Sequence, residues 1–194
     1  MLALRLATCA ALLSSFLPAA GRAQASGWRF LVSIPAHSPL APQDGRLLLL
    51  VSTDSTAEPR FQMADGPRTQ VLFGQDVNNM RRGQAIGITP EAGYPLGRLA
   101  DLPPGRYWVQ ALLNRYQTFR RSDGHTVKLP PDQGEGQQWN SKPGNLYSPP
   151  RWITLSKRSP VLIRLELTET IAPIPRSAET RYVKYERIQS KLLT

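Results

Sequence analysis

The segment from Leu99 to Leu113 constrains the fold more than any other part of the chain. Pro104-Gly105 is a turn signal, and from Arg106 onward apolar and polar residues alternate. A two-residue period is typical of an antiparallel strand with one buried face. Tyr107 follows the turn at the start of this strand, which is the position of a tyrosine corner, whose hydroxyl bonds the backbone a few residues upstream. The segment therefore predicts a β-sandwich.

Other apolar segments are short and separated by proline and glycine. The predicted strands lie at residues 28–34, 46–52, 70–73, 84–88, 106–113, 152–155 and 161–168. The chain has 18 prolines, and a proline inside a helix costs about 3 kcal/mol, so few windows of helical length remain. We expect an all-β fold: an immunoglobulin-like antiparallel β-sandwich over residues 26–172, with one long loop excursion and a C-terminal extension.

The first 25 residues have the pattern of a signal peptide. Arg5 supplies positive charge, residues 6–17 are apolar, and Ala23-Gln24-Ala25 fits a cleavage site. The apolar run is too short to span a bilayer comfortably, so we expect no stable membrane insertion once it is removed. Cys9, the single cysteine, lies inside this run and too early for a lipoprotein box. We expect an exported protein, periplasmic or extracellular, without disulfides.

The formal net charge of +10 allows anionic partners, but its distribution favours a solvated surface. Basic residues occur in pairs such as Arg81-Arg82 and Lys157-Arg158, not in the long runs of interaction tails. The chain has no basic helix and no zinc-finger spacing, so we predict no nucleic-acid partner.

Two regions depart from the strand pattern. Residues 114–150 form a polar stretch rich in glycine and proline, in which only 126–129 resembles a strand, and loops of this length are usually functional or disordered. Residues 173–175 are predicted to be an extended linker. The remainder, to Thr194, is ambiguous, because Tyr182, Tyr185, Ile188 and Leu192 would share one face of a helix while 183–188 also suits a strand.

The sequence offers little for catalysis. It contains no Gly-x-Ser-x-Gly elbow, which an acyl hydrolase needs to hold its nucleophile on a strained turn. The two histidines, His37 and His125, fall in predicted turns. A serine–histidine–acid triad through His125 is an alternative, but nothing in the sequence selects the serine.

Acidic residues and a histidine gather in the long excursion. Asp123, His125, Asp132 and Glu135 could supply oxygen and imidazole ligands to a hard cation such as calcium, although their spacing matches no EF-hand loop. The alternative is a solvated polar turn. Gly134-Glu-Gly136 lacks the third glycine of a nucleotide fingerprint, and we predict no cofactor.

Three aromatic residues accompany the excursion: Trp139, Tyr147 and Trp152. Amides lie near them in sequence, so the rings could stack on sugars while the amides bond hydroxyls, or they could form a domain interface. A third interpretation is that they anchor an otherwise polar loop. The sequence does not choose among the three.

Several motifs together resemble a known protein group. They are Glu58-Pro-Arg60-Phe61, Phe73-Gly-Gln-Asp76-Val77, Gly93-Tyr-Pro95, the segments 99–111, 113–116, 124–130 and 132–140, and Gly144-Asn-Leu-Tyr-Ser148. The chain is similar to the leader domain of large exported bacterial proteins in which a β-sandwich precedes an α/β-hydrolase domain of the enterochelin-esterase group. Residues 182–190 resemble the segment in which that hydrolase domain begins.

The resemblance implies that the hydrolase domain, with its serine elbow, acid and histidine, would lie beyond Thr194. No catalytic residue is therefore carried over to this chain. The expected function is that of a non-catalytic accessory domain that packs against a hydrolase domain, in the same chain or in another. The alternatives are a carbohydrate-binding module of the cell envelope, which would use Trp139, Tyr147 and Trp152 to bind glycan, and a small hydrolase that uses His125.

Overall fold

The computed structural model describes residues 27–64, 66, 69–89, 91–156, 161–175 and 179–186. Within these residues the chain forms strands and two short 3-10 helices. The strands are β1 (Trp28–Ser33), β2 (Gln43–Ser52), β3 (Val71–Met80), β4 (Ala85–Gly87), β5 (Gly93–Tyr94), β6 (Gly105–Arg115), β7 (Gln117–Arg120), β8 (Thr126–Leu129), β9 (Leu146–Tyr147), β10 (Arg151–Leu155), β11 (Val161–Glu166) and β12 (Glu169–Thr170). The 3-10 helices are η1 (Pro59–Phe61) and η2 (Leu99–Asp101).

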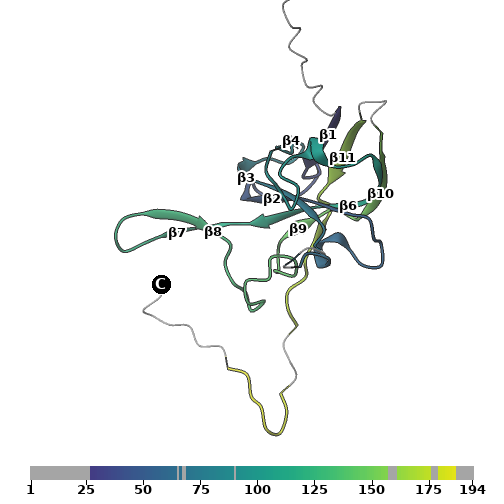
Figure 1. The fold of residues 1–194 in the computed structure, drawn as a ribbon. Coiled ribbons are helices and arrows are strands. Elements are labelled where there is room, and N and C mark those ends of the chain that lie inside the picture. The colour runs from purple at the N-terminus through teal and green to yellow at the C-terminus, as the bar shows by residue number, and fades with distance from the viewer. Residues whose placement is uncertain are drawn as a thin grey trace, which may run out of the picture.

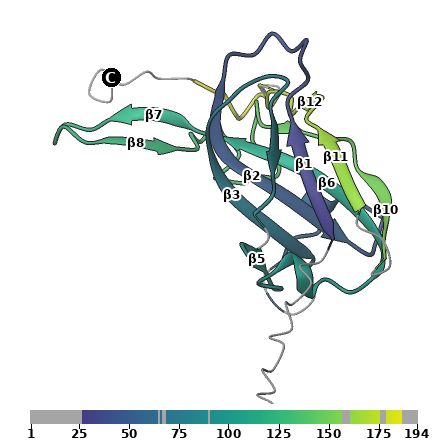
Figure 2. The same cartoon turned by 90° about the horizontal axis from the view of Figure 1, so that it is seen from above.

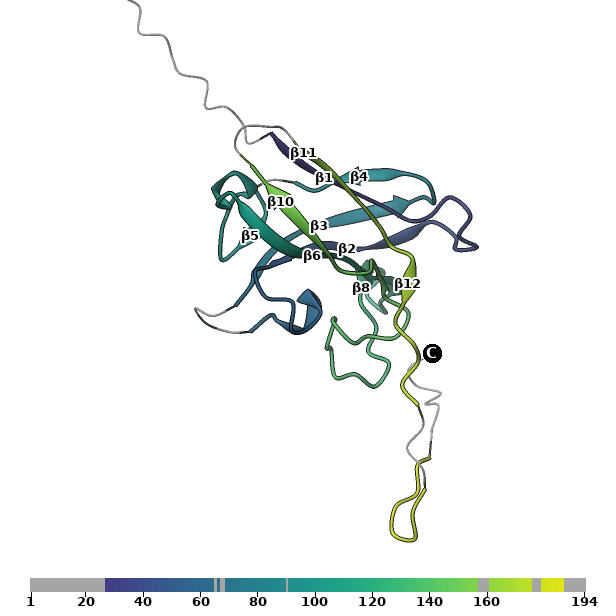
Figure 3. The same cartoon turned by 90° about the vertical axis from the view of Figure 1, so that its right-hand side faces the viewer.

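The strands form two facing layers, so the predicted all-β sandwich is confirmed (Figure 3). One layer is a three-stranded sheet in the order β11-β1-β4. The other is a seven-stranded sheet. Six of its strands follow in the order β12-β9-β6-β2-β3-β5, and the seventh, β10, pairs with the first half of β6 on the same edge as β9. Among the named strands, every pair is antiparallel except β1 with β11, which run parallel from Trp28 opposite Val161 to Ser33 opposite Glu166.

The main core lies between the two sheets and follows the alternation of the sequence. β1 and β11 contribute alternate residues from the small sheet, while β2, β3 and β6 contribute theirs from the large sheet. The largest fully buried side chains of this core include Phe30, Ile34, Leu47, Leu49, Phe73, Met80 and Leu113. Each fully buried side chain of this size stabilises the fold by about 1.5–3 kcal/mol through the hydrophobic effect.

The turn before β6 has the predicted tyrosine corner. The Tyr107 hydroxyl donates a hydrogen bond of 2.7 Å to the carbonyl oxygen of Pro103, and the ring is buried in the main core. The bond fixes the path of the chain where it leaves η2 and enters the large sheet. The local pattern from Leu99 onward therefore predicts both the strand and its corner correctly.

The large sheet also buries residues on its other side, which we call the outer face. Leu48 and Leu50 of β2 and Leu112 of β6 form a second, smaller cluster there. Trp139, Tyr147 and other half-buried side chains pack against it. Figure 3 shows the loops of the excursion and η1 lying against this side of the sheet, opposite the small sheet. The continuous apolar run of β2 is explained because both faces of that strand are covered.

The predicted excursion has two parts. Its first part is the hairpin of β7 and β8, which stands away from the sandwich as a two-stranded ribbon (Figures 1 and 2). Its second part, residues 130–145, passes over the outer face before β9 returns the chain to the edge of β6. β8 coincides with the predicted strand at 126–129, whereas β7 was missed because its residues are polar or exposed.

Other predictions differ from the structure in the length of an element, or concern residues that the structure does not describe. β3 continues to Met80, well beyond the predicted 70–73. Residues 179–186 form neither helix nor strand, so neither expectation for this segment is met within its described part. The predicted signal peptide and Lys157-Arg158 lie outside the described residues. Among the described residues, the structure contains no helical segment with the length and hydropathy of a membrane span.

Candidate functional site

Every second residue of β6 points to the outer face. Before Leu112, these residues are Arg106, Trp108 and Gln110. Trp108 lies opposite Trp152 of β10, and the two ring centroids are 5.4 Å apart with their planes tilted by 49°. The Arg106 guanidinium carbon lies 4.3 Å from the centroid of Trp152, which is a cation–π contact. The tryptophans therefore do not form the coplanar platform that a sugar-stacking site would need.

A second arginine occupies the same face. The helix η1 places Arg60 with its guanidinium carbon 4.1 Å from the Tyr147 ring centroid, and its Nε lies 2.8 Å from Glu58 Oε2. One terminal nitrogen donates to the backbone oxygen of Asn140 at 3.2 Å. Arg60 is buried, and its charge is balanced by the carboxylate beside it. This arginine links η1, the excursion and β9 into one structural unit.

Gln110 of β6 is fully buried, and its side chain holds this unit to the sheet by hydrogen bonds. Its amide nitrogen donates to Glu58 Oε2 at 2.8 Å and to the backbone oxygen of Ser148 at 3.0 Å. Its amide oxygen accepts the backbone N–H of Arg60 at 3.2 Å. Since these bonds use the donors and the acceptor of the side chain, Gln110 fixes the structure and presents no group to a ligand.

The structure places the three predicted aromatic residues on this one face, but in different roles. Trp139 and Tyr147 pack on the Leu48–Leu50–Leu112 cluster, and Asn145 donates to the backbone oxygen of Trp139 at 2.8 Å. These contacts fit the anchoring interpretation, because the rings supply the apolar contacts of residues 130–145. Trp152 instead pairs with Trp108.

The four candidate metal ligands do not come together. Asp123 and His125 lie in the turn between β7 and β8, where Asp123 Oδ1 accepts the His125 backbone N–H at 3.0 Å. The His125 side chain is 78% exposed, and its Nδ1 is 3.2 Å from the same oxygen. Asp132 and Glu135 lie beyond β8, and each accepts a local backbone N–H, from Gly134 and Gln133 respectively, at 2.7 Å.

Each of these acids therefore stabilises its own turn. Among the described residues, no group of three or more histidine, cysteine, aspartate or glutamate side chains could hold a metal ion. The predicted cluster was inferred from proximity in sequence, and the hairpin separates its first two members from the other two.

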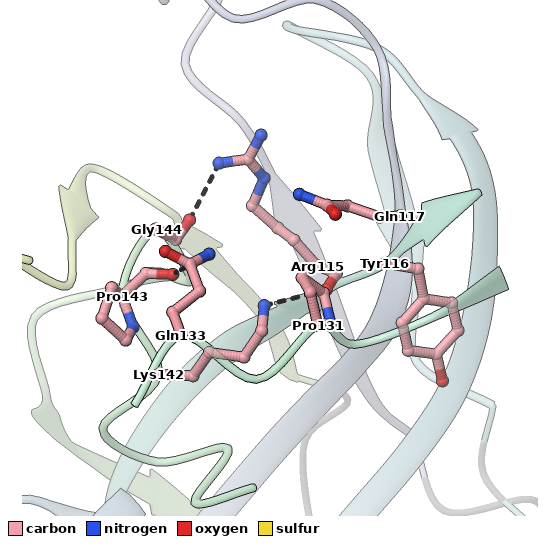
Figure 4. A pocket seen from close by; sticks show the side chains of 8 residues that line it. All are labelled: Arg115, Tyr116, Gln117, Pro131, Gln133, Lys142, Pro143 and Gly144. Atoms are coloured by element: carbon pink, nitrogen blue, oxygen red, sulfur yellow. Dashed lines mark hydrogen bonds between the residues drawn. The ribbon is translucent and has the colours of Figure 1, made fainter. Parts of the chain in front are cut away.

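A small pocket opens at the base of the hairpin, where the end of β6 meets residues 131–144 (Figure 4). It has a volume of about 70 Å³. The residues that line it are Arg115, Tyr116, Gln117, Pro131, Gln133, Lys142, Pro143 and Gly144. Two of them are cations, and none is an acid.

Lys142 is the most unusual residue of the pocket, because it is only 3% exposed. Its ammonium donates to the backbone oxygen of Arg115 at 3.0 Å and to Asn145 Oδ1 at 3.1 Å. The Arg115 guanidinium donates to the backbone oxygen of Gly144 at 3.0 Å and to the side-chain oxygen of Gln43. Figure 4 shows the Gly144 bond and the bond from Lys142 to the Arg115 carbonyl.

Burial lowers the pKa of both Lys142 and Arg115, because desolvation disfavours a charged group. For Lys142, the negative charge of Glu135 opposes this lowering of the pKa, and the positive charge of Arg115 adds to it. Sequence reasoning missed this pair, because the two residues are 27 positions apart and Lys142 lies in a loop, where lysine is normally exposed.

Comparison of the chain with protein-family models, with curated proteins and with solved structures gave no match.

Proposed function

We propose that this chain is an exported, non-catalytic accessory domain that packs against an α/β-hydrolase domain of the esterase type, with the β7–β8 hairpin as the main contact. The observation that carries the proposal is the exposed apolar face of this hairpin. The registers Phe119 opposite Val127 and Gln117 opposite Leu129 put these four side chains on one face of the ribbon.

Two of the apolar side chains on this face are substantially exposed, Phe119 at 40% and Leu129 at 53%. A two-stranded ribbon is marginally stable in water unless it packs against something. In Figures 1 and 2 the ribbon extends from the sandwich with no other described segment alongside it. Its apolar face thus has the character of a surface that a partner covers.

The base of the hairpin is held firmly, which gives the ribbon a defined direction. Lys128 forms an ion pair of 2.8 Å with Asp44 of β2 and donates to Asn78 of β3 at 3.0 Å. The Tyr116 hydroxyl donates to Asp76 of β3 at 3.1 Å. A preorganised arm loses less conformational entropy on binding than a free loop does.

The choice of an esterase-type hydrolase domain as partner rests on the sequence resemblance and on the C-terminal segment. Tyr182, Val183 and Tyr185 are all exposed, Tyr182 at 84%. This segment resembles the start of the hydrolase domain in the similar proteins, where we infer that these side chains contribute to the same interface as the hairpin.

The two alternatives receive less support from the geometry. A sugar would need an open aromatic surface, but the Tyr147 ring is covered by Arg60 and the Trp152 ring is contacted by Arg106. A hydrolase that used His125 would need an enclosed site around the imidazole, and this imidazole is exposed in the turn between β7 and β8.

The test is binding of the purified chain to a purified esterase-type hydrolase domain of the similar proteins, measured by calorimetry. We expect a saturable complex that the double variant Phe119→Ser/Leu129→Ser weakens about tenfold or more, since these side chains would be central to the interface. The control is Thr118→Ala/Thr126→Ala on the opposite face, which should bind as the unaltered chain does. Failure to bind, equal binding by both variants, or ester hydrolysis by the purified chain alone would contradict the proposal.

A further inference from the structure

We infer that the pocket between Arg115 and Lys142 binds a compact oxyanion, that is, a carboxylate or phosphate group. This inference concerns the chain alone and does not depend on the proposed hydrolase partner. Three observations support it: positive charge that no ion pair balances among the described residues, the donor groups of the lining residues, and the size of the pocket.

The first observation is the unbalanced charge. The hydrogen bonds of Lys142 and Arg115 go to neutral oxygens, and neither forms an ion pair with a carboxylate among the described residues. Buried charges in proteins are normally paired, because an unpaired one loses hydration without compensation. Arg60 in this same protein follows the rule, since its buried guanidinium is paired with Glu58. Lys142 and Arg115 depart from this rule, and an anion bound in the pocket would supply the negative charge that pairs with them.

The second observation is the set of donors. The Arg115 guanidinium already donates through Nε to Gln43 and through one terminal nitrogen to Gly144, so it offers its remaining terminal N–H groups to a carboxylate or phosphate, and Lys142 adds a point charge. The side-chain amides of Gln117 and Gln133 also line the pocket, and Figure 4 shows them on either side of the Arg115 side chain. Cationic and neutral donors together form the type of surface that binds oxyanions.

The third observation is the volume. About 10–15 Å³ on this measure of volume holds one water molecule, so a pocket of about 70 Å³ has room for a group of several heavy atoms. That size suits one carboxylate or phosphate group.

Among the described residues, Glu135 is the acid whose negative charge acts on Lys142, and it gives the inference a sharp test. It raises the pKa of Lys142 without forming an ion pair with it, and its Oε1 is buried without a hydrogen-bond partner among the described residues. A negative charge that acts on Lys142 also repels an anion that enters the pocket. Glu135→Gln should therefore strengthen anion binding, whereas loss of a cation should weaken it.

The experiment titrates the purified chain with inorganic phosphate and, separately, with acetate, at constant ionic strength with chloride as the balancing salt. Binding is followed by NMR through the backbone amide signals of Tyr116, Gln117 and Gly144. We expect saturable shifts with at least one of the two anions. Lys142→Gln should weaken binding about tenfold, because a charge-assisted bond is lost, and Glu135→Gln should strengthen it about twofold.

Arg29→Gln is the matched control, because it removes one exposed positive charge from β1, in the opposite sheet. It should leave the affinity unchanged. Since Lys142→Gln alters a buried residue and can fail to fold, Gln117→Leu at an exposed lining position is the second variant, and it should weaken binding about threefold. Stronger binding of acetate assigns the pocket to carboxylates, and stronger binding of phosphate assigns it to phosphates. Absence of saturation with both anions, or an equal loss in Arg29→Gln, would overturn the inference.

Discussion

Lys128 Nζ lies 2.8 Å from Asp44 Oδ2, and this ion pair joins the projecting hairpin to the start of β2. Asp44 also accepts the backbone N–H of Asn79 at 2.7 Å through its other oxygen. One carboxylate therefore connects β2, β3 and β8. Both contacts lower the pKa of Asp44, the bond from Lys128 more than the bond from Asn79.

The lowered pKa predicts how Asp44 contributes to stability as the pH changes. The unfolded state takes up a proton near the ordinary value of 3.8, while the folded state keeps the carboxylate charged to lower pH. The contribution is therefore present above pH 3.8 and is lost as the pH falls through the folded-state pKa. Asp44→Asn should reduce the free energy of unfolding by up to about 1 kcal/mol at neutral pH.

Urea denaturation at neutral and at acid pH measures this difference, which should shrink well below pH 3.8. The control is a double-mutant cycle with Lys128→Met, in which the two single changes should not add because they remove the same ion pair. Fully additive losses would show that the ion pair does not carry the effect.

The tyrosine corner gives a second prediction. Tyr107→Phe removes the hydroxyl that bonds Pro103 and keeps the buried ring. We expect the free energy of unfolding to fall by about 1–2 kcal/mol, because the carbonyl loses its partner in a partly buried place. Tyr116→Phe is the control, since its hydroxyl bonds the exposed side chain of Asp76 and should matter less. Equal losses in both variants, measured by chemical denaturation, would contradict this role for the corner.

A third prediction concerns Gly93 in β5. A Cβ atom there would overlap the backbone oxygen of Leu96 and the ring of Phe73, which is fully buried in the main core. Gly93→Ala should therefore lower stability by about 1–3 kcal/mol through overpacking. Gly97→Ala, four residues away, is a matched control because a Cβ there meets no atom within 4 Å. Thermal denaturation should shift for the first variant and not for the second.

The anchoring role of Trp139 gives a fourth prediction. Trp139→Ala should release residues 130–145 from the outer face while the main core, on the other side of the large sheet, keeps its packing. Hydrogen exchange of the backbone amides in this segment, such as that of Asn145, should then accelerate more than exchange in β6. Gln138→Ala alters the exposed neighbour and should change the exchange rate neither in this segment nor in β6. Uniform acceleration across the whole domain would mean that Trp139 supports the entire fold instead.

The sequence predicted best what is decided locally. The segment from Leu99 to Leu113 contains its own turn, its own alternation and its own tyrosine, so strand and corner follow from neighbouring residues. The full length of β3 could not be predicted in this way, because beyond Phe73 it contains glycine and polar residues that become a strand only by pairing with β2. The parallel pairing of β1 with β11 likewise depends on residues far apart in the chain.

The candidate sites show the same division. The aromatic residues were found because large rings are conspicuous in a polar loop, but whether Trp139 faces solvent or the Leu48–Leu50–Leu112 cluster depends on tertiary packing. Lys142 was missed because nothing nearby in the sequence indicates that its ammonium is enclosed by the carbonyl of Arg115 and by Asn145. The arginines that cover Tyr147 and Trp152 were missed for the same reason.

The parallel pairing of β1 with β11 has a consequence for the order of events during folding. β1 can pair with β4 early, but its second neighbour, β11, is complete only when the chain has been made as far as Glu166, so the small sheet is completed late. Until then one edge of β1 is unpaired, and the main core around Phe30 and Val32 lacks the side chains that β11 later contributes. Such long-range closure slows folding and leaves an aggregation-prone edge open meanwhile, so a chaperone that shields the N-terminal strand would raise the yield of folded protein.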